Sequence, residues 1–173
     1  EKKDEKIEEV NLNQEITKII KPNQKLLVQI KKDSNERKGA RTSTHINLPG
    51  KYVVLMPNTN IVTISQKINN VQEQERLLKI VKENISKENG AIIRTSAEGK
   101  EKEVIEEIKK LEKKWQEIFQ KSRQENIKAP RLLYKSEDIV EKMLIDLADK
   151  NVDSVTVNDS RDYNQISNIK SEN

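Results

Sequence analysis

The fold follows mainly from VQIKKDSNERKGARTSTHINLPGKYVVLMPN, residues 28–58. Runs rich in β-branched and aromatic residues alternate here with turn-forming residues, such as Pro49-Gly50. Together with the residues on either side, this pattern predicts strands at 25–32, 41–48, 51–57 and 61–65. The short connections between these runs are typical of antiparallel neighbours, so we expect an antiparallel meander.

Helical periodicity follows the strands. Apolar residues recur at intervals of three and four over 71–85, and Asn70 is placed to cap that helix. A short buried strand is predicted at 91–95, and a long helix at 101–123. The long helix has one apolar stripe, in which Trp115 reads as a core residue, and a Glu/Lys-rich face that reads as solvated.

The remaining segments are shorter. A strand at 131–134, a helix at 137–149 and a strand at 154–157 would form the opening of a βαβ unit, followed by a polar tail. At the other end, residues 1–14 have no apolar period and read as a solvated loop. The predicted fold class is therefore α+β, with antiparallel strands, a small α+β middle and a truncated βαβ segment.

Composition excludes several classes of protein. The 173 residues include no Cys and a single His, which removes disulfides, thiolate metal sites and multi-histidine zinc sites. Hydrophobic residues make up 33% and charged residues 36%, so the core must be small and aliphatic. Apolar runs are far shorter than the roughly 20 residues that span a bilayer, and the charged N-terminus lacks a signal sequence. We therefore expect a cytoplasmic protein without a membrane partner.

The net charge of +4 is unevenly distributed. Residues 21–67 contain nine basic side chains against two acidic ones, whereas residues 1–15 have a net charge of −3. The nine basic residues are Lys21, Lys25, Lys31, Lys32, Arg37, Lys38, Arg41, Lys51 and Lys67. A basic block confined to a strand-forming segment is typical of a surface that binds a polyanion. A genome that favours Lys codons would explain the same composition without any binding function.

The order of motifs resembles the ribonuclease E/G family over roughly residues 16–160. Beyond residues 28–58, the similar stretches are ISQKI (64–68), IIRTSAEGK (92–100), the long helix with Trp115, APRLLYKSEDIV (129–140) and VDSVTVND (152–159). The resemblance implies an endoribonuclease of RNA processing and decay that prefers single-stranded RNA with a 5′ monophosphate. It also implies a partial OB-fold RNA-binding barrel at 1–44, a 5′-sensor domain at 45–138 and the start of an RNase H-like domain at 139–173.

The resemblance assigns roles to individual residues. Arg94 and Thr95 match the pair that holds the terminal phosphate, for which a guanidinium fork and a hydroxyl are suitable donors. The implied pocket is closed, so that a triphosphate is too bulky and a 5′ hydroxyl leaves buried donors unpaired. Gly50 and Val54 match the positions that line the first nucleotide, where a missing side chain admits close approach. Three lysines are assigned to RNA binding, namely Lys32, Lys38 and Lys67.

Some residues depart from the family pattern or have simpler explanations. Gln66-Lys67 stands where the family often has an Arg-Arg pair, which reduces the expected electrostatic support for the phosphate. His45 and Asp159 are interpreted as structural. Without the resemblance, Arg94 would most simply be a surface ion-pair residue and Thr95 a turn cap.

The residues that perform catalysis are expected elsewhere. The family's metal-binding carboxylates and zinc-linking cysteines match nothing in this sequence, so we expect an internal fragment that is inactive alone. The parent enzyme would use Mg²⁺ bound outside this chain and would be a homo-oligomer. Half a barrel leaves unpaired strand edges, so we expect residues 1–44 to be poorly ordered, swapped or rearranged.

Two other functions fit the same residues. One is a non-enzymatic, basic RNA-binding module without end preference, whose affinity would fall steeply with salt. The other is an interaction protein that docks a partner through the charged helix 101–123. A preference for one 5′ end group would distinguish the first hypothesis from these two.

Overall fold

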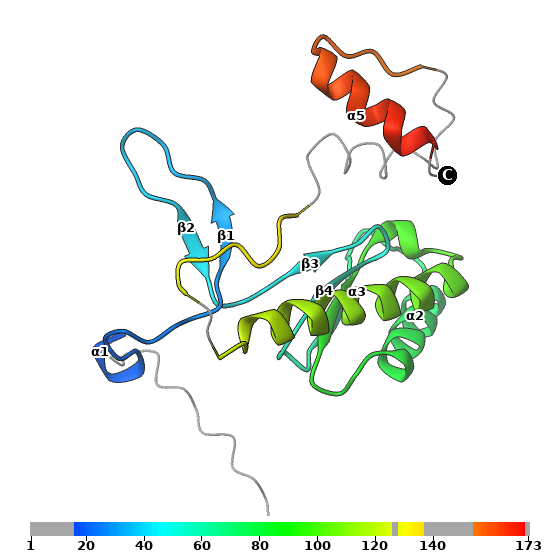
Figure 1. Ribbon diagram of the computed structural model, residues 1–173. Helices are drawn as coiled ribbons and strands as arrows, with labels where there is room; N and C mark the ends of the chain where they lie inside the picture. Colours follow the sequence, from blue (N-terminus) through cyan, green and yellow to red (C-terminus); the bar gives the residue numbers. More distant parts are fainter. Residues whose placement is uncertain (1–15, 126–127, 137–153, 172–173) are drawn as a thin grey trace, which may run out of the picture.

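The computed structural model describes residues 16–125, 128–136 and 154–171, and it has a mixed α+β fold. Its elements, in chain order, are α1 (Ile16–Ile19), β1 (Gln29–Lys32), β2 (Arg41–Ser43), β3 (Leu48–Pro49), β4 (Val53–Met56), β5 (Val62–Ile64), α2 (Val71–Asn84), β6 (Gly90–Ile93), the 3-10 helix η1 (Thr95–Ala97), α3 (Glu101–Ser122) and α5 (Ser160–Ser171). The strands form a two-stranded sheet, β1-β2, and a four-stranded sheet with the order β3-β4-β6-β5 (Figure 1).

The four-stranded sheet is mixed, so the predicted antiparallel meander is wrong in one respect. β3 pairs with β4 and β4 with β6 in antiparallel register, but β5 runs parallel to β6 and does not pair with β4. The cause is the helix between them, because β5, α2 and β6 form a crossover that returns the chain in the same direction. β6 thereby occupies the centre of the sheet, between β4 and β5.

The core lies between this sheet and the two long helices. α2 contacts β5 and β6, α3 contacts β4, and the helices contact each other. Alternate strand residues are therefore buried against the helices, among them Val53 and Leu55 of β4 and Ile93 of β6. Their neighbours Val54 and Ile92 point to the other face, which is partly exposed.

Both long helices follow the predicted periodicity. Asn70 caps α2, and its side-chain oxygen accepts a hydrogen bond from the backbone N–H of Glu73 at 3.2 Å. α3 buries one stripe that includes Trp115, whose ring lies 5.6 Å from that of Phe119. The predictions of an N-cap at Asn70 and of a core role for Trp115 are confirmed.

The two strands predicted in the C-terminal part of the chain are not formed in the segments that the structure describes. Residues 131–134 and 154–157 form no strand, because neither segment is paired with a strand among the described residues. Instead, Tyr134 packs on α3, where Lys114 Nζ lies 3.3 Å from its hydroxyl. The predicted helix 137–149 lies outside the described residues. The polar tail contains helix α5, an element that was not predicted.

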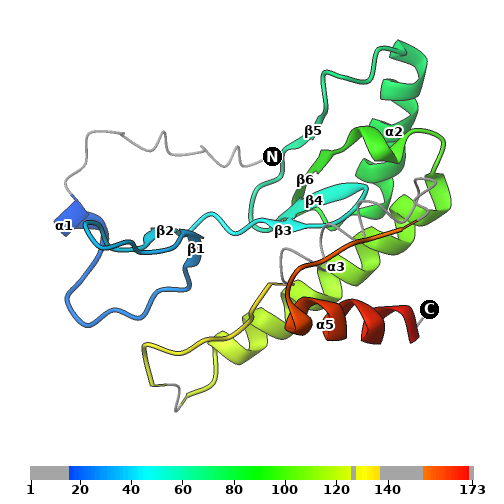
Figure 2. The same cartoon turned by 90° about the horizontal axis from the view of Figure 1, so that it is seen from above.

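The β1-β2 hairpin forms a sheet of its own and projects from the helical part of the fold (Figures 1 and 2). Its strands are shorter than predicted, and its register shifts between Ile30 and Lys32. Ile30 is 58% exposed. Among the described residues, these two strands do not close a barrel. The expectation that residues 1–44 are poorly ordered, swapped or rearranged remains a prediction. The predicted domain boundaries at 44/45 and 138/139 remain predictions.

Candidate functional site

The candidate phosphate-binding residues gather at one edge of the four-stranded sheet. β5 and β6 are parallel, so both end at this edge, and the turn between β3 and β4 lies beside them. Two backbone hydrogen bonds hold the edge together beyond the strands. Arg94 N–H donates to the Tyr52 carbonyl at 2.8 Å, and Ser65 N–H donates to the Ile93 carbonyl at 2.9 Å. The carboxyl ends of parallel strands often form binding sites.

The side chain of Arg94 is held across this edge. Its Nη1 donates a hydrogen bond of 2.7 Å to the carbonyl oxygen of Gly50, a residue 44 positions earlier in the chain. Arg94 is half-buried, whereas Thr95, the first residue of η1, is exposed. The expectation of a closed pocket that excludes a triphosphate remains a prediction.

The other predicted residues of this site lie close by along the sheet. Val54 is half-buried on the face away from the helices and pairs with Ile92 in the sheet register. Lys67 is exposed on the loop after β5, and its backbone N–H lies 3.4 Å from the Ser65 hydroxyl. The structure thus brings Gly50, Arg94 and Thr95 to one edge, with Lys67 on the adjoining loop.

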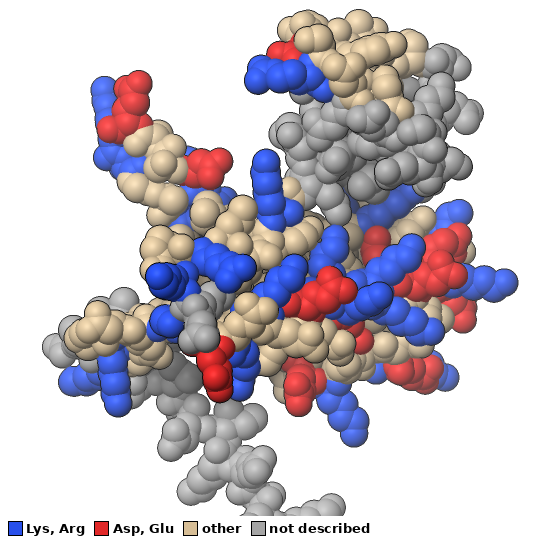
Figure 3. Space-filling view, in the orientation of Figure 1, with Lys and Arg blue, Asp and Glu red and all other residues tan. Residues whose placement is uncertain are grey.

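Lys32 and Lys38 lie in a different part of the molecule. Both are exposed on the β1-β2 hairpin, where the backbone of Lys38 bonds with that of Asn35 in the connecting loop. In Figure 3, basic side chains gather around the base of this hairpin, whereas basic and acidic side chains alternate over the helices. The hairpin lysines therefore belong to a second surface, distinct from the sheet edge.

One residue of the edge was not predicted. The carboxylate of Glu107, on α3, accepts hydrogen bonds from the backbone N–H groups of Lys51 at 2.6 Å, Tyr52 at 2.7 Å and Val53 at 2.8 Å. Glu107 belongs to the Glu/Lys-rich face of this helix, which was expected to be solvated. The available signal was its position three residues after Val104 and four before Leu111, both buried, which sets it on the apolar stripe.

A network of charges stabilises the loop that follows Thr95. Glu73, in the first turn of α2, accepts hydrogen bonds from Arg76 Nε at 2.7 Å and from the Gly99 N–H at 2.9 Å. Arg76 also pairs with Glu101 at 2.9 Å. The hydrogen bond from Arg76, assisted by that from Gly99, lowers the pKa of Glu73 to about 2. The bonds to Glu73 also raise the pKa of Arg76.

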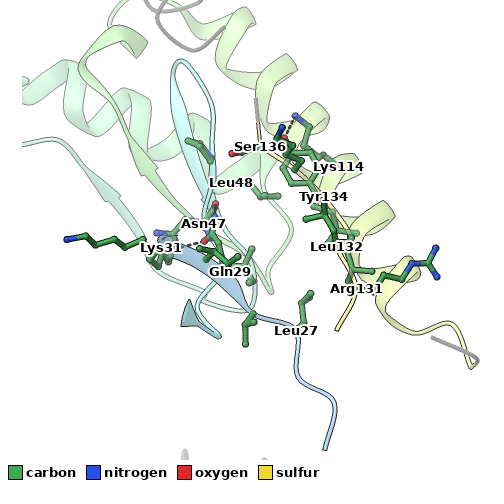
Figure 4. A pocket seen from close by; sticks show the side chains of 18 of the residues that line it. Leu27, Gln29, Lys31, Asn47, Leu48, Lys114, Arg131, Leu132, Tyr134 and Ser136 are labelled. Carbon is green, nitrogen blue, oxygen red and sulfur yellow. Dashed lines mark hydrogen bonds between the residues drawn. The ribbon is translucent and has the colours of Figure 1, made fainter. Parts of the chain in front are cut away.

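A groove of about 800 Å³ lies apart from the sheet edge (Figure 4). Its walls come from β1, residues 46–49, the second half of α3 and residues 130–136. The basic residues that line it are Lys31, Lys32, Lys114, Arg131 and Lys135, against a single acidic residue, Asp33. Of the predicted site residues, only Lys32 lines this groove. The groove offers positive charge and apolar surface, but neither residue of the predicted phosphate-binding pair lines it.

Neither a metal-binding cluster nor a membrane-spanning helix is present among the described residues. There, no group of three or more His, Asp or Glu side chains is arranged to hold a metal ion. A Mg²⁺ site outside this chain remains a prediction. Asp159 is placed at the start of α5, where its carboxylate accepts a hydrogen bond from the Arg161 N–H at 2.7 Å. None of the helices in these segments has the length and apolar character needed to cross a bilayer.

Comparison with known proteins identifies the family. A sequence profile of the Ribonuclease E/G family matches residues 47–173. The chain is 35% identical over 152 residues to Ribonuclease E of Nostoc sp., covering 87% of this chain and 22% of that protein. It is 33% identical over 159 residues to Ribonuclease G of Escherichia coli, covering 91% of this chain and 32% of that protein. A Ribonuclease E/G-like protein of Porphyra purpurea is 37% identical over 152 residues, covering 87% and 29%.

The chain thus spans between about a fifth and a third of the length of these curated relatives. The similarity includes the strands of the four-stranded sheet, both long helices and the sheet edge that presents Arg94 and Thr95. The chain belongs to the ribonuclease E/G family.

Proposed function

We propose that this chain is the RNA-recognition part of an endoribonuclease and that its sheet edge binds the 5′ monophosphate of single-stranded RNA. Arg94 would supply a planar pair of N–H donors to the phosphate oxygens, and the Thr95 hydroxyl a further hydrogen bond. Gly50 and Val54 would lie beside the first nucleotide. The relatives named above are ribonucleases by name, which supports RNA as the ligand.

The observation on which the proposal rests is the 2.7 Å hydrogen bond between Arg94 and the Gly50 carbonyl. An unrestrained arginine loses considerable side-chain entropy when it binds an anion. This bond restrains the guanidinium before the ligand arrives, and the next residue in the chain is the exposed Thr95. A preorganised donor fork next to a hydroxyl is suited to a terminal phosphate, which offers several oxygens at one point.

The rest of the RNA strand would follow the basic surface. The sheet edge has Lys67 on its adjoining loop, and the hairpin adds Lys32 and Lys38. These lysines would contact internal phosphates, so they would contribute affinity that does not depend on the end group. Phosphodiester hydrolysis would take place at a Mg²⁺ site contributed by other parts of a full-length family member.

The test is equilibrium binding of one short single-stranded RNA that bears a 5′ monophosphate, a 5′ hydroxyl or a 5′ triphosphate. The chain and its Arg94→Ala variant would be compared at fixed salt, with Arg161→Ala, an exposed arginine of α5, as the control for loss of one positive charge. We expect the monophosphate to bind about tenfold more tightly than the hydroxyl, since a charge-assisted bond contributes about 1.5–3 kcal/mol. Arg94→Ala should abolish this difference, and Arg161→Ala should keep it.

Equal binding of the three ends by the unchanged chain would contradict the proposal. That result would favour a basic RNA-binding module without end preference. Absence of RNA binding altogether would favour an interaction role for α3.

A further inference from the structure

Glu107 holds the turn between β3 and β4 from the side of the helices. Its two carboxylate oxygens accept three consecutive backbone N–H groups, at distances of 2.6–2.8 Å. Consecutive N–H groups that converge on one anion form a nest, and bonds to a charged acceptor are stronger than neutral ones. The turn and α3 are more than 50 residues apart in sequence, so this contact is a specific tertiary link.

Gly50 is adapted to the same carboxylate. A methyl group added at Gly50 would lie 2.5 Å from Cδ and 2.6 Å from Oε2 of Glu107. The glycine is therefore required by Glu107, a reason for it that the sequence analysis did not consider. Its backbone N–H also donates to the Val53 carbonyl at 2.8 Å, which closes the turn.

The opposite side of the turn faces the candidate phosphate site. The Gly50 carbonyl accepts the bond from Arg94, and the next carbonyl, of Lys51, accepts one from the hydroxyl of Ser96. The amides of the turn thus point to Glu107 while its carbonyls hold the segment that contains Arg94 and Thr95. A peptide unit is rigid, so fixing the amides fixes the direction of the carbonyls.

We propose that Glu107 is a positioning residue that sets the orientation of Arg94 through the β3-β4 turn and so determines the preference for a phosphorylated RNA end. This inference rests on the proposed function. Loss of the carboxylate would let the three amides turn towards water, and the Gly50 carbonyl would no longer hold the guanidinium. The RNA would still bind through its internal phosphates, but without discrimination between its ends.

The chain contains a matched control for a purely structural role. Glu112, one turn further along α3, accepts the Ser86 N–H at 2.9 Å and the Asn89 side-chain amide at 2.8 Å. It therefore anchors a loop to the same helix in the same way, but at the turn between α2 and β6. Glu106 is exposed beside Glu107 and controls for the loss of one negative charge.

The experiment measures the ratio of the Kd for 5′-hydroxyl RNA to the Kd for 5′-monophosphate RNA in the full chain. Glu107→Ala should lower this ratio about tenfold, to near one, while the Kd for the hydroxyl RNA stays within about twofold. Glu107→Gln, which keeps one acceptor oxygen, should give an intermediate ratio. Glu112→Ala should lower the melting temperature without changing the ratio, and Glu106→Ala should change neither.

Chemical rescue adds a readout that a general loss of stability would not produce. Acetate can occupy the space left by Glu107→Ala and accept the same three N–H groups. Sodium acetate should therefore restore the ratio in this variant, when compared with sodium chloride at equal ionic strength, because RNA binding depends on salt. Circular dichroism would verify that each variant is folded, and Glu107→Gln replaces the alanine variant in the comparison if the latter unfolds.

The outcomes separate the two proposals. A ratio near one in the unchanged chain overturns the end-binding function and, with it, the role of Glu107. A ratio that Arg94→Ala abolishes but Glu107→Ala and Glu107→Gln both retain overturns only the role of Glu107.

Discussion

Arg94 Nη1 and the carbonyl oxygen of Gly50 are joined by a 2.7 Å hydrogen bond that ties the end of β6 to the β3-β4 turn. The bond depends on elements from three parts of the sequence, because Glu107 of α3 fixes the same turn from its other side. The candidate phosphate site is thus built on a rigid sheet edge, and its geometry is set by backbone groups that no single motif contains.

Replacing Arg94 by lysine tests whether the site requires a guanidinium. The ammonium of Arg94→Lys keeps the charge, but it is a point charge and cannot form the planar pair of hydrogen bonds. We expect the preference for monophosphate over hydroxyl RNA to fall about fivefold, with little change in hydroxyl binding. Competition binding with the two RNAs measures the difference. If Arg94→Lys kept the whole preference, the site would be recognising charge alone.

The hairpin lysines should affect affinity without affecting end preference. Lys32→Ala and Lys38→Ala each remove one exposed cation from a surface separate from the sheet edge. Each should weaken all RNAs alike and reduce the slope of log Kd against log salt by about 0.7. Lys113→Ala, an exposed lysine of α3, is the control. A change in the ratio between phosphorylated and hydroxyl ends would contradict the assignment of these lysines to internal phosphates.

The sequence predicted those parts of the fold that depend on local pattern. Strong amphipathic periods marked α2 and α3, and a polar residue before an apolar run marked the cap at Asn70. The pairing of β5 with β6 was missed because strand direction depends on the crossover through α2, which hydrophobic alternation does not encode. Residues 131–134 have strand-like composition but no paired strand in the described part of the chain, and composition cannot supply one.

The site was predictable to a similar degree. The Arg94-Thr95 motif follows a buried strand in a recognisable pattern, so a family resemblance could assign it. Glu107 was missed because a Glu within a Glu/Lys-rich helix is most simply interpreted as solvated, although its spacing from Val104 and Leu111 places it on the apolar stripe. Its role comes from a turn more than 50 residues away, which only the tertiary structure reveals.

Gly50 and Glu107 should be energetically coupled. Gly50→Ala would force the carboxylate away from its three N–H partners, and we expect it to lower the free energy of unfolding by about 1–3 kcal/mol. In a Glu107→Ala background the same change meets no carboxylate and should cost much less. Urea unfolding of the two single variants and the double variant measures this coupling. Additive effects would show that the close approach at Gly50 is relieved without disturbing the turn.

Gly90, the first residue of β6, tests how closely this strand packs against the 59–61 loop. A methyl group there would collide with the backbone carbonyl oxygens of Thr59 and Ile61, which cannot move aside as a side chain can. Gly90→Ala should therefore destabilise the protein by about 1–3 kcal/mol. Gly39→Ala is the matched control, because no atom lies within 4 Å of the added methyl group and Gly39 lies in the hairpin loop. Equal melting temperatures for the two variants would contradict the position of β6 beside the 59–61 loop.

The salt-bridge network around Glu73 makes the stability depend on pH. The pKa of Glu73 is about 2 in the folded chain against an ordinary value of 4.5, mainly because Arg76 and then the Gly99 N–H bond to its carboxylate. The unfolded chain therefore binds the proton more readily, so this contribution to stability is complete above about pH 4.5 and is lost as the pH falls towards 2. Glu73→Gln should be less stable than the unchanged chain at neutral pH, and the difference should shrink across this window. Urea unfolding at several pH values measures this difference, with Glu75→Gln, an exposed Glu of the same helix, as the control.

Arg76→Ala should move the NMR titration midpoint of the Glu73 carboxyl group upwards, and an unchanged midpoint would show that Arg76 is not the main cause of its low pKa.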